Sequence, residues 1–152
     1  MRFLLDTNVV SELRKGRRAH PAVLAWRVGV RTSDAALSVV TLLELTLGIE
    51  LKAQKDESAG PALRAWYERR LKPSFAGRIL PVDVAVAEQA AALHAMRARP
   101  GNDALIAATA LVHGLTLATR NRRDFAGIAG LRQVDPWSGA PELPDRPDPE
   151  PC

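Results

Sequence analysis

The sequence is poor in cysteine and has no long apolar run. Its single cysteine, Cys152, is the last of 152 residues, so no internal disulfide can form. No apolar stretch approaches the roughly 20 residues that cross a bilayer. The start of the chain, Met1–Asp6, is too short an apolar segment for a secretory signal. We therefore expect a cytoplasmic protein without membrane contact.

Acidic residues are scarce in the first 134 residues, which hold 20 basic and 12 acidic side chains and carry a net charge of +8. A basic surface favours a polyanionic partner, because lysine and arginine that neutralise phosphates release counterions. Charge that only keeps the protein in solution is the alternative. The length is typical of one domain with a real core.

The end of the chain has a different composition. Residues 136–152 contain six of the eleven prolines and almost no apolar residue after Leu143. No internal repeat is visible. We expect one domain over residues 1–137, followed by a disordered, Pro-rich acidic tail over residues 138–152.

Short apolar runs alternate with longer helical patterns. The predicted strands are Phe3–Leu5, Ala36–Val40, Arg78–Val82, Leu115–Thr119 and Leu131–Val134. The predicted helices are Val9–Lys15, Ala22–Val28, Thr41–Lys55, Pro61–Lys72, Val84–Arg99 and Asp103–His113. Strands that alternate with helices predict an α/β fold, with a central parallel sheet of four to five strands flanked by helices.

Four acidic residues follow or face the ends of these strands. Asp6 ends the first strand, and Glu44 lies in the first turn of the helix after the second. Asp103 opens an apolar helix, and Asp124 lies just beyond the fourth strand. Because function gathers at the carboxyl ends of parallel strands, we expect the four carboxylates at one edge of the sheet.

Each acid also has a purely structural interpretation. Thr41 and Glu44 have the spacing of a capping box, and Asp103 is a plausible helix N-cap. Asp6 could only form a turn, and Asp124 could be a solvated loop residue. Taken singly, each structural interpretation is favoured. They do not explain why all four acids occur at one edge.

Clustered carboxylates repel one another, so they need protons or cations to coexist. A site with oxygen ligands only suits Mg²⁺ or Mn²⁺, and Mg²⁺ commonly binds phosphate oxygens together with few carboxylates. An acidic notch in a basic surface is what a nuclease needs.

The motifs around these acids resemble the successive signatures of PIN-domain ribonucleases, and among them the VapC-type toxins. The matching segments are residues 4–8, 38–45, 102–110 and 117–125, and the resemblance extends to the segment 134–137. The resemblance implies a homodimeric, metal-dependent endoribonuclease that leaves a 5′-phosphate and a 3′-hydroxyl. It also implies a cognate VapB-type antitoxin, which blocks the site and alone brings the pair to operator DNA.

The resemblance assigns roles to six residues of the site. Asp6 and Asp103 are expected to bind Mg²⁺ or Mn²⁺ directly, and Glu44 and Asp124 to complete the acidic set, directly or through waters. Thr119 would arrange the pocket, or only cap the turn at Asn121. Asn8 would orient Asp6, or satisfy only its own turn.

Other residues have weaker indications. Arg120, Arg122 and Arg123 could grip RNA phosphates or be solvated. Asp83 is expected to cap a helix. The predicted helices Thr41–Lys55 and Pro61–Lys72 are candidates for the dimer or antitoxin surface.

Three other functions compete with the toxin. An RNA-processing PIN nuclease would share every signature. A non-catalytic corepressor bound to an antitoxin should have lost one or more acids. A haloacid-dehalogenase-like phosphatase needs an Asp-x-Asp motif, whereas the second position after Asp6 is Asn8.

Overall fold

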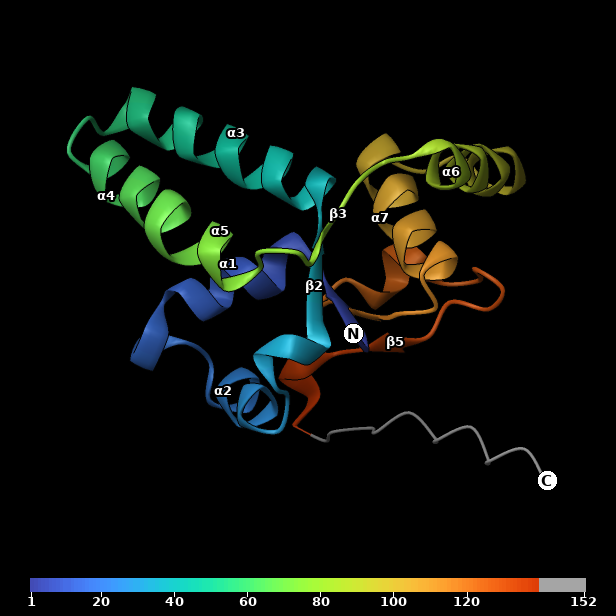
Figure 1. The fold of residues 1–152 in the computed structure, drawn as a ribbon, viewed down its shortest axis with the longest axis horizontal. Helices are drawn as coiled ribbons and strands as arrows, with labels where there is room; N and C mark the ends of the chain where they lie inside the picture. Colours follow the sequence, from blue (N-terminus) through green and yellow to red (C-terminus); the bar gives the residue numbers. More distant parts are fainter. Residues whose placement is uncertain (140–152) are drawn as a thin grey trace.

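The computed structural model describes residues 1–139 and shows a five-stranded sheet in which every pairing is parallel (Figure 1). The strand order is β3-β2-β1-β4-β5. The strands are β1 (Phe3–Leu5), β2 (Ala35–Ser38), β3 (Ile79–Leu80), β4 (Thr116–Ala118) and β5 (Gln133–Val134). The predicted α/β class and the five parallel strands are confirmed.

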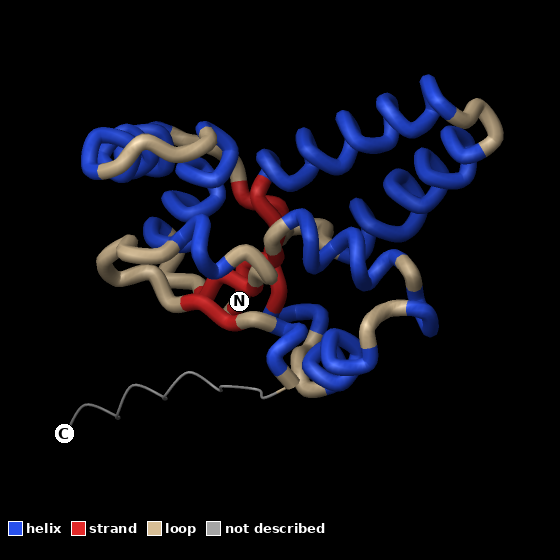
Figure 2. Tube along the Cα trace, turned by 180° about the vertical axis from the view of Figure 1, so that it is seen from behind, coloured by secondary structure: helices blue, strands red, loops and turns tan. Residues whose placement is uncertain are grey.

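Helices cover both faces of the sheet (Figures 1 and 2). They are α1 (Thr7–Arg14), α2 (Pro21–Val28), α3 (Val39–Lys55), α4 (Ala59–Trp66), α5 (Lys72–Ser74), α6 (Val84–Met96) and α7 (Gly101–Val112). Short 3₁₀ turns are η1 (Gly16–Arg18), η2 (Thr32–Asp34), η4 (Arg122–Phe125) and η5 (Pro136–Ser138), and α4 continues through a π-helical turn, η3 (Tyr67–Leu71). The predicted helix Pro61–Lys72 therefore covers most of α4, all of η3 and the first residue of α5. None of the described helices is long and apolar enough to cross a membrane.

Alternate residues of each strand enter two separate hydrophobic cores. In β1, Leu4 faces the core under α6 and α7, whereas Phe3 and Leu5 face the core under α1 and α2. This alternation follows from the two-residue period of a strand. Burial of such a side chain is worth roughly 1.5–3 kcal/mol, so both helical layers are held to the sheet.

The order of the strands places a crevice beside β1. The chain passes outward from β1 to β2 and β3, then returns to add β4 and β5 on the other side of β1. In such sheets ligands bind outside the carboxyl ends of the strands, where the direction of winding reverses. This point lies between β1 and β4, the two strands that Asp6 and Thr119 follow.

Helices α3 and α4 form a long hairpin (Figure 1) that packs closely at Gly60. A Cβ atom on Gly60 would lie 2.9 Å from the Cβ of Ala53, so only glycine allows this approach. Arg64 on α4 and Glu50 on α3 form an exposed ion pair across the hairpin at 3.0 Å.

The predicted boundaries differ from the structure by a few residues in several elements, and in the second strand the difference has a clear physical cause. The predicted strand Ala36–Val40 is observed as Ala35–Ser38, because the Ser38 hydroxyl accepts a hydrogen bond from the Val40 amide and starts α3 at Val39. The predicted acidic tail lies outside the described residues from residue 140 onward.

Candidate active site

Asp6 is the most firmly held acid of the site. Its side chain is 6% exposed and lies between the end of β1 and the start of α1. Oδ1 accepts a hydrogen bond from the Thr7 amide at 2.8 Å, as an N-cap does. Oδ2 accepts one from the Thr119 hydroxyl at 2.7 Å and one from Asn8 Nδ2 at 3.3 Å. The orientation of this carboxylate is therefore set by three donors.

Asn8 and Thr119 connect the ends of β1 and β4. Asn8 Oδ1 accepts a hydrogen bond from the Arg120 amide at 3.3 Å, and Thr119 Oγ1 accepts one from the Asn121 amide at 3.0 Å. Thr119 therefore bonds Asp6 and also caps the turn at Asn121, while its part in catalysis stays a prediction. Asn8 donates to Asp6, as expected, and also holds the turn after β4.

Glu44 reaches the site from the second turn of α3 rather than the first. Helix α3 begins at Val39 with Ser38 as its N-cap, so the capping-box interpretation of Thr41 and Glu44 is wrong. Thr41 Oγ1 is buried and has no hydrogen-bond partner within residues 1–139. Glu44 Oε1 instead accepts a hydrogen bond from the Thr7 hydroxyl at 2.8 Å.

Asp103 lies in the first turn of α7, facing the other acids. The helix begins at Gly101 after Pro100, so the N-cap interpretation of Asp103 is wrong. Its pKa is raised to about 6, first by burial and then by the negative charges of Asp6, Asp124 and Glu44; Arg99 opposes this shift. The negative charges of all three other acids therefore act on Asp103.

Asp124 completes the set from η4, on the exposed side. Its charge contributes to the raised pKa of Asp6, which is caused first by burial and is opposed by the hydrogen bonds from Thr119, Thr7 and Asn8. The solvated-loop interpretation describes its exposure correctly. Because its charge also acts on Asp6 and Asp103, Asp124 is assigned to the exposed rim of the acidic site.

The donor set is made of carboxylate, hydroxyl and amide oxygens, which are ligands for a hard cation. Within residues 1–139, no three acidic, histidine or cysteine side chains lie close enough to hold one ion together. Mg²⁺ is usually bound through one or two carboxylates and keeps several waters. The arrangement therefore fits a cation held by few direct ligands.

Comparison with known proteins gives this arrangement a family. The PIN domain family matches residues 3–131, a stretch that contains all four acids. The chain belongs to the PIN-domain family.

Several relatives of this PIN domain are named as toxins or ribonucleases. The VapC ribonuclease Y4jK of Sinorhizobium fredii is 37% identical over 149 residues, which cover 91% of this chain and 99% of the relative. A crystal structure of FitAcB from Neisseria gonorrhoeae matches with a TM-score of 0.77 and 35% identity, covering 89% of this chain and 98% of the other. A toxin–antitoxin complex from Klebsiella pneumoniae matches at 33% identity with a TM-score of 0.62, covering 88% and 96%. The predicted resemblance to VapC-type toxins is confirmed.

A groove of about 600 Å³ adjoins the acidic site of the PIN domain. Thr7 and Glu44 form its end at the site, and the α3–α4 hairpin forms one wall. Arg14 and Lys52 also line it, so cationic side chains lie within the groove that leads from the acids. This charge pattern suits a chain of phosphates.

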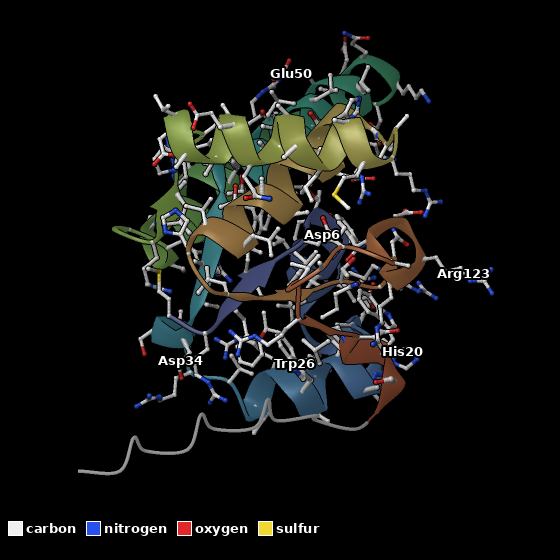
Figure 3. The ribbon with its side chains drawn as sticks, turned by 90° about the vertical axis from the view of Figure 1, so that its right-hand side faces the viewer. Asp6, His20, Trp26, Asp34, Glu50 and Arg123 are labelled. Carbon is white, nitrogen blue, oxygen red and sulfur yellow. The ribbon has the colours of Figure 1, made fainter. Side chains whose placement is uncertain are left out.

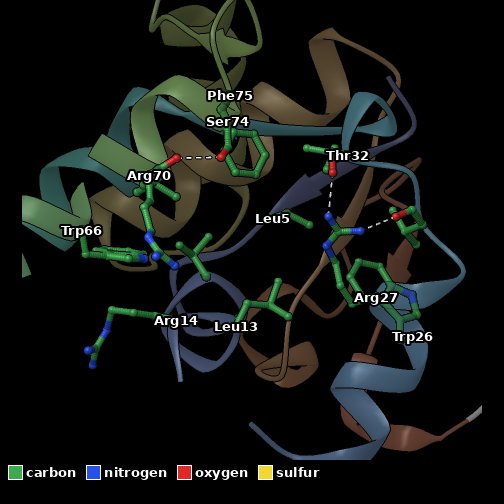
Figure 4. Close-up of a pocket in the computed structure, with 14 residues that line it drawn as sticks. Leu5, Leu13, Arg14, Trp26, Arg27, Thr32, Trp66, Arg70, Ser74 and Phe75 are labelled. Atoms are coloured by element: carbon green, nitrogen blue, oxygen red, sulfur yellow. Dashed lines mark hydrogen bonds between the residues drawn. The ribbon is translucent and has the colours of Figure 1, made fainter. Parts of the chain in front are cut away.

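A second cavity of about 210 Å³ lies under α1, α2 and η3 (Figure 4). No carboxylate lines it, so it is separate from the acidic site. Arg27 closes one wall by donating to the Val30 carbonyl and the Thr32 hydroxyl, both at 2.6 Å. Trp66 forms part of another wall, and the Cζ atom of Arg14 lies 5.8 Å from the centre of its ring.

The three arginines after β4 differ in their surroundings. All are exposed, and Arg123 extends away from the body of the PIN domain (Figure 3). Arg120 instead lies over the ring of Trp137, with its Cζ 5.2 Å from the ring centre. Phosphate contact by Arg120, Arg122 and Arg123 stays a prediction.

Sequence reasoning missed two residues of this region. Thr7 stands between Asp6 and Asn8, but nothing in the sequence shows that its hydroxyl meets Glu44, 37 positions away. For Trp137, the one indication in the sequence was its position shortly after the last predicted strand.

Asp83 caps α6 by accepting a hydrogen bond from the Val86 amide at 2.9 Å, as predicted.

Proposed function

We propose that this PIN domain is a divalent-metal-dependent endoribonuclease that acts as the toxin of a type II toxin–antitoxin pair. The observation that carries the proposal is the geometry at the carboxyl edge of the sheet. There the buried Asp6 carboxylate is held by three hydrogen bonds, and the Thr7 hydroxyl beside it holds Glu44 at 2.8 Å. RNA hydrolysis is supported by the match to the PIN domain family and by the relative named VapC ribonuclease. It is also supported by the net positive charge of residues 1–134.

Asp6 and Asp103 would hold Mg²⁺ or Mn²⁺, with Glu44 and Asp124 acting directly or through waters. When bound, the cation lowers the pKa of a water and neutralises charge on the scissile phosphate. Its positive charge would also oppose the burial and the negative charges that raise the pKa of Asp103, and would favour the ionised form of this acid.

The chain's own residues orient the reaction. Thr119 and Asn8 fix the direction of the Asp6 carboxylate, and Thr7 fixes that of Glu44. A carboxylate of this set would hold the attacking water in line with the leaving oxygen. Hydrolysis would leave a 5′-phosphate and a 3′-hydroxyl on RNA.

We propose a VapB-type antitoxin as the regulatory partner, because the structural relatives include a toxin–antitoxin complex. Operator DNA would be bound only through that antitoxin, and the toxin would act in the cytoplasm as a homodimer. Helix α3 leaves an apolar stripe about half exposed, formed by Leu43, Leu47 and Leu51 at four-residue spacing. Light scattering of a Leu47→Glu variant tests whether this stripe is a dimer or antitoxin surface. If it is, the homodimer or the complex with the antitoxin should dissociate.

RNA cleavage by the purified chain, freed of any copurified partner, tests the proposed function. Cutting should require Mg²⁺ or Mn²⁺, stop with EDTA, and vanish in Asp6→Asn. A folded wild-type protein that cuts none of several structured RNAs, with or without metal, would contradict the proposal and favour the non-catalytic corepressor. An antitoxin gene beside this one would separate the toxin from an RNA-processing nuclease.

A further inference from the structure

Functional residues follow one another along the carboxyl edge of the sheet. Asp6 follows β1, Thr119 follows β4, and Trp137 follows β5, while Glu44 belongs to the helix after β2. The strands lie in the order β2-β1-β4-β5, all parallel. Because parallel strands end at the same edge, Asp6, Glu44 and Trp137 lie along that edge. Neighbouring strands are about 4.8 Å apart.

Arg120 links the acidic site to Trp137. Its backbone amide is tied to Asn8, which itself bonds Asp6, so the residue starts at the rim of the site. Its guanidinium lies 5.2 Å from the centre of the Trp137 ring. Within residues 1–139, the Arg120 side chain makes no ion pair. Its charge is therefore not neutralised by this part of the chain.

Trp137 is held in place on its other sides. Asp135 accepts a hydrogen bond from the Trp137 amide at 2.9 Å and caps η5, and η5 packs against α2. The indole is partly buried against the core under α1 and α2. A fixed ring under an exposed guanidinium limits the directions in which the arginine can point.

We infer that Arg120 and Trp137 form a subsite for a nucleotide of single-stranded RNA next to the scissile phosphate. The inference rests on the proposed function. An arginine plane stacks on nucleobases, and its N–H edge binds phosphate oxygens. Arg120 provides both surfaces, and Trp137 is a positioning residue that holds the guanidinium beside the acids.

Arg122 and Arg123 offer charge without this organisation. Both are exposed on η4, and neither lies over an aromatic ring in the described part of the chain. They would attract RNA from any direction. The structure therefore singles out Arg120 from the three arginines that were equivalent in the sequence.

The test measures RNA binding in an Asp6→Asn background and cleavage in the wild-type background. The probe is a fluorescein-labelled single-stranded oligouridylate, followed by anisotropy. Trp137→Leu and Arg120→Ala should each weaken binding about tenfold, as loss of one stacked contact does, and should raise KM with kcat nearly unchanged. Trp137→Phe, which keeps a ring, should restore most of the affinity.

Arg132→Ala is the matched control. It also removes one exposed arginine, but Arg132 lies at the opposite, amino edge of the same strands, where it bonds the Gly114 carbonyl at 2.8 Å. Arg132→Ala should weaken RNA binding much less than Arg120→Ala does. The Arg120→Ala variant should keep the fold, because the Arg120 side chain is exposed.

The outcomes separate the subsite from the proposed function. Unchanged affinity and KM in both Trp137→Leu and Arg120→Ala would overturn the subsite and leave the stack a structural contact. Normal cleavage combined with weaker capture of a copurified antitoxin would assign the pair to a protein partner instead. A parent protein that neither binds nor cuts RNA would overturn the nuclease itself.

Discussion

The two halves of the acidic site are built on different principles. On the side of β1 and β4, Asp6 is buried and receives three hydrogen bonds. On the side of α3 and α7, Glu44 receives one from Thr7, and Asp103 is placed by its helix, with a pKa raised to about 6. One half is rigid without a cation. In the other half, burial and the neighbouring negative charges disfavour the ionised form of Asp103, and a cation would favour it. The two halves should therefore respond differently to the same substitution.

The largest expected effect is the loss of activity in Asp6→Asn and Asp103→Asn. Each should lower kcat/KM about a thousandfold or more, because a metal site supplies several kcal/mol of charge stabilisation. The metal-free stabilities should diverge. Asp103→Asn should raise Tm, since it removes a carboxylate whose charge is disfavoured by burial and by the other acids. Asp6→Asn should lower Tm, since the new amide group is itself a donor and would face the donors that now bond the carboxylate. Equal shifts in calorimetry would contradict the division into two halves.

Thr119→Val should lower kcat/KM by about 10–100-fold, the usual cost of losing a group that orients a metal ligand. The substitution also leaves the Asn121 amide without its acceptor. Chemical denaturation should show a loss of about 1–3 kcal/mol. Thr119→Ser keeps the hydroxyl and is the control. If the serine variant loses as much kcat/KM as the valine variant, the hydrogen bond to Asp6 is not the cause of the loss.

Thr7→Val tests the other half and should have a smaller effect, about tenfold in kcat/KM. The Thr7 side chain is partly exposed, so its loss should change the free energy of unfolding by about 1 kcal/mol or less. Thr7→Ser should restore cleavage. An effect larger than that of Thr119→Val would mean that Glu44, rather than Asp6, depends most on its support.

The smallest effect is the pH dependence of metal-free stability. The folded pKa of Asp103 lies above its ordinary value, so the folded state binds the proton more tightly than the unfolded chain. Stability should therefore rise as pH falls from about 7 to 5. After allowance for solvent screening, the gain should be about 1 kcal/mol or less. Asp103→Asn should flatten this slope in thermal scans, and an unchanged slope would show that other groups cause it.

Convergence of the four acids could be predicted from the sequence because of how parallel sheets are built. Once the strands are recognised, their carboxyl ends must meet at one edge, whichever residues follow them. The helix starts were less accessible, because Ser38 and Thr41 are both good N-cap residues. Ser38 prevails, and Val40 and Thr41 are buried within α3. The hydrogen bond from Thr7 to Glu44 and the stack of Arg120 on Trp137 depend on side-chain directions that no pattern records.

The direct junction of β2 with α3 limits how the chain can vary in length. Strand β2 ends at Ser38 and helix α3 begins at the next residue, Val39. Glu44, six positions after Ser38, accepts the hydrogen bond from Thr7. Because one residue turns a helix by about 100°, a single deletion within residues 39–43 would rotate Glu44 away from the acids. The turn between α3 and α4, at residues 56–58, has no such consequence for the site. Insertions and deletions should therefore be tolerated at the tip of the hairpin and not at its base.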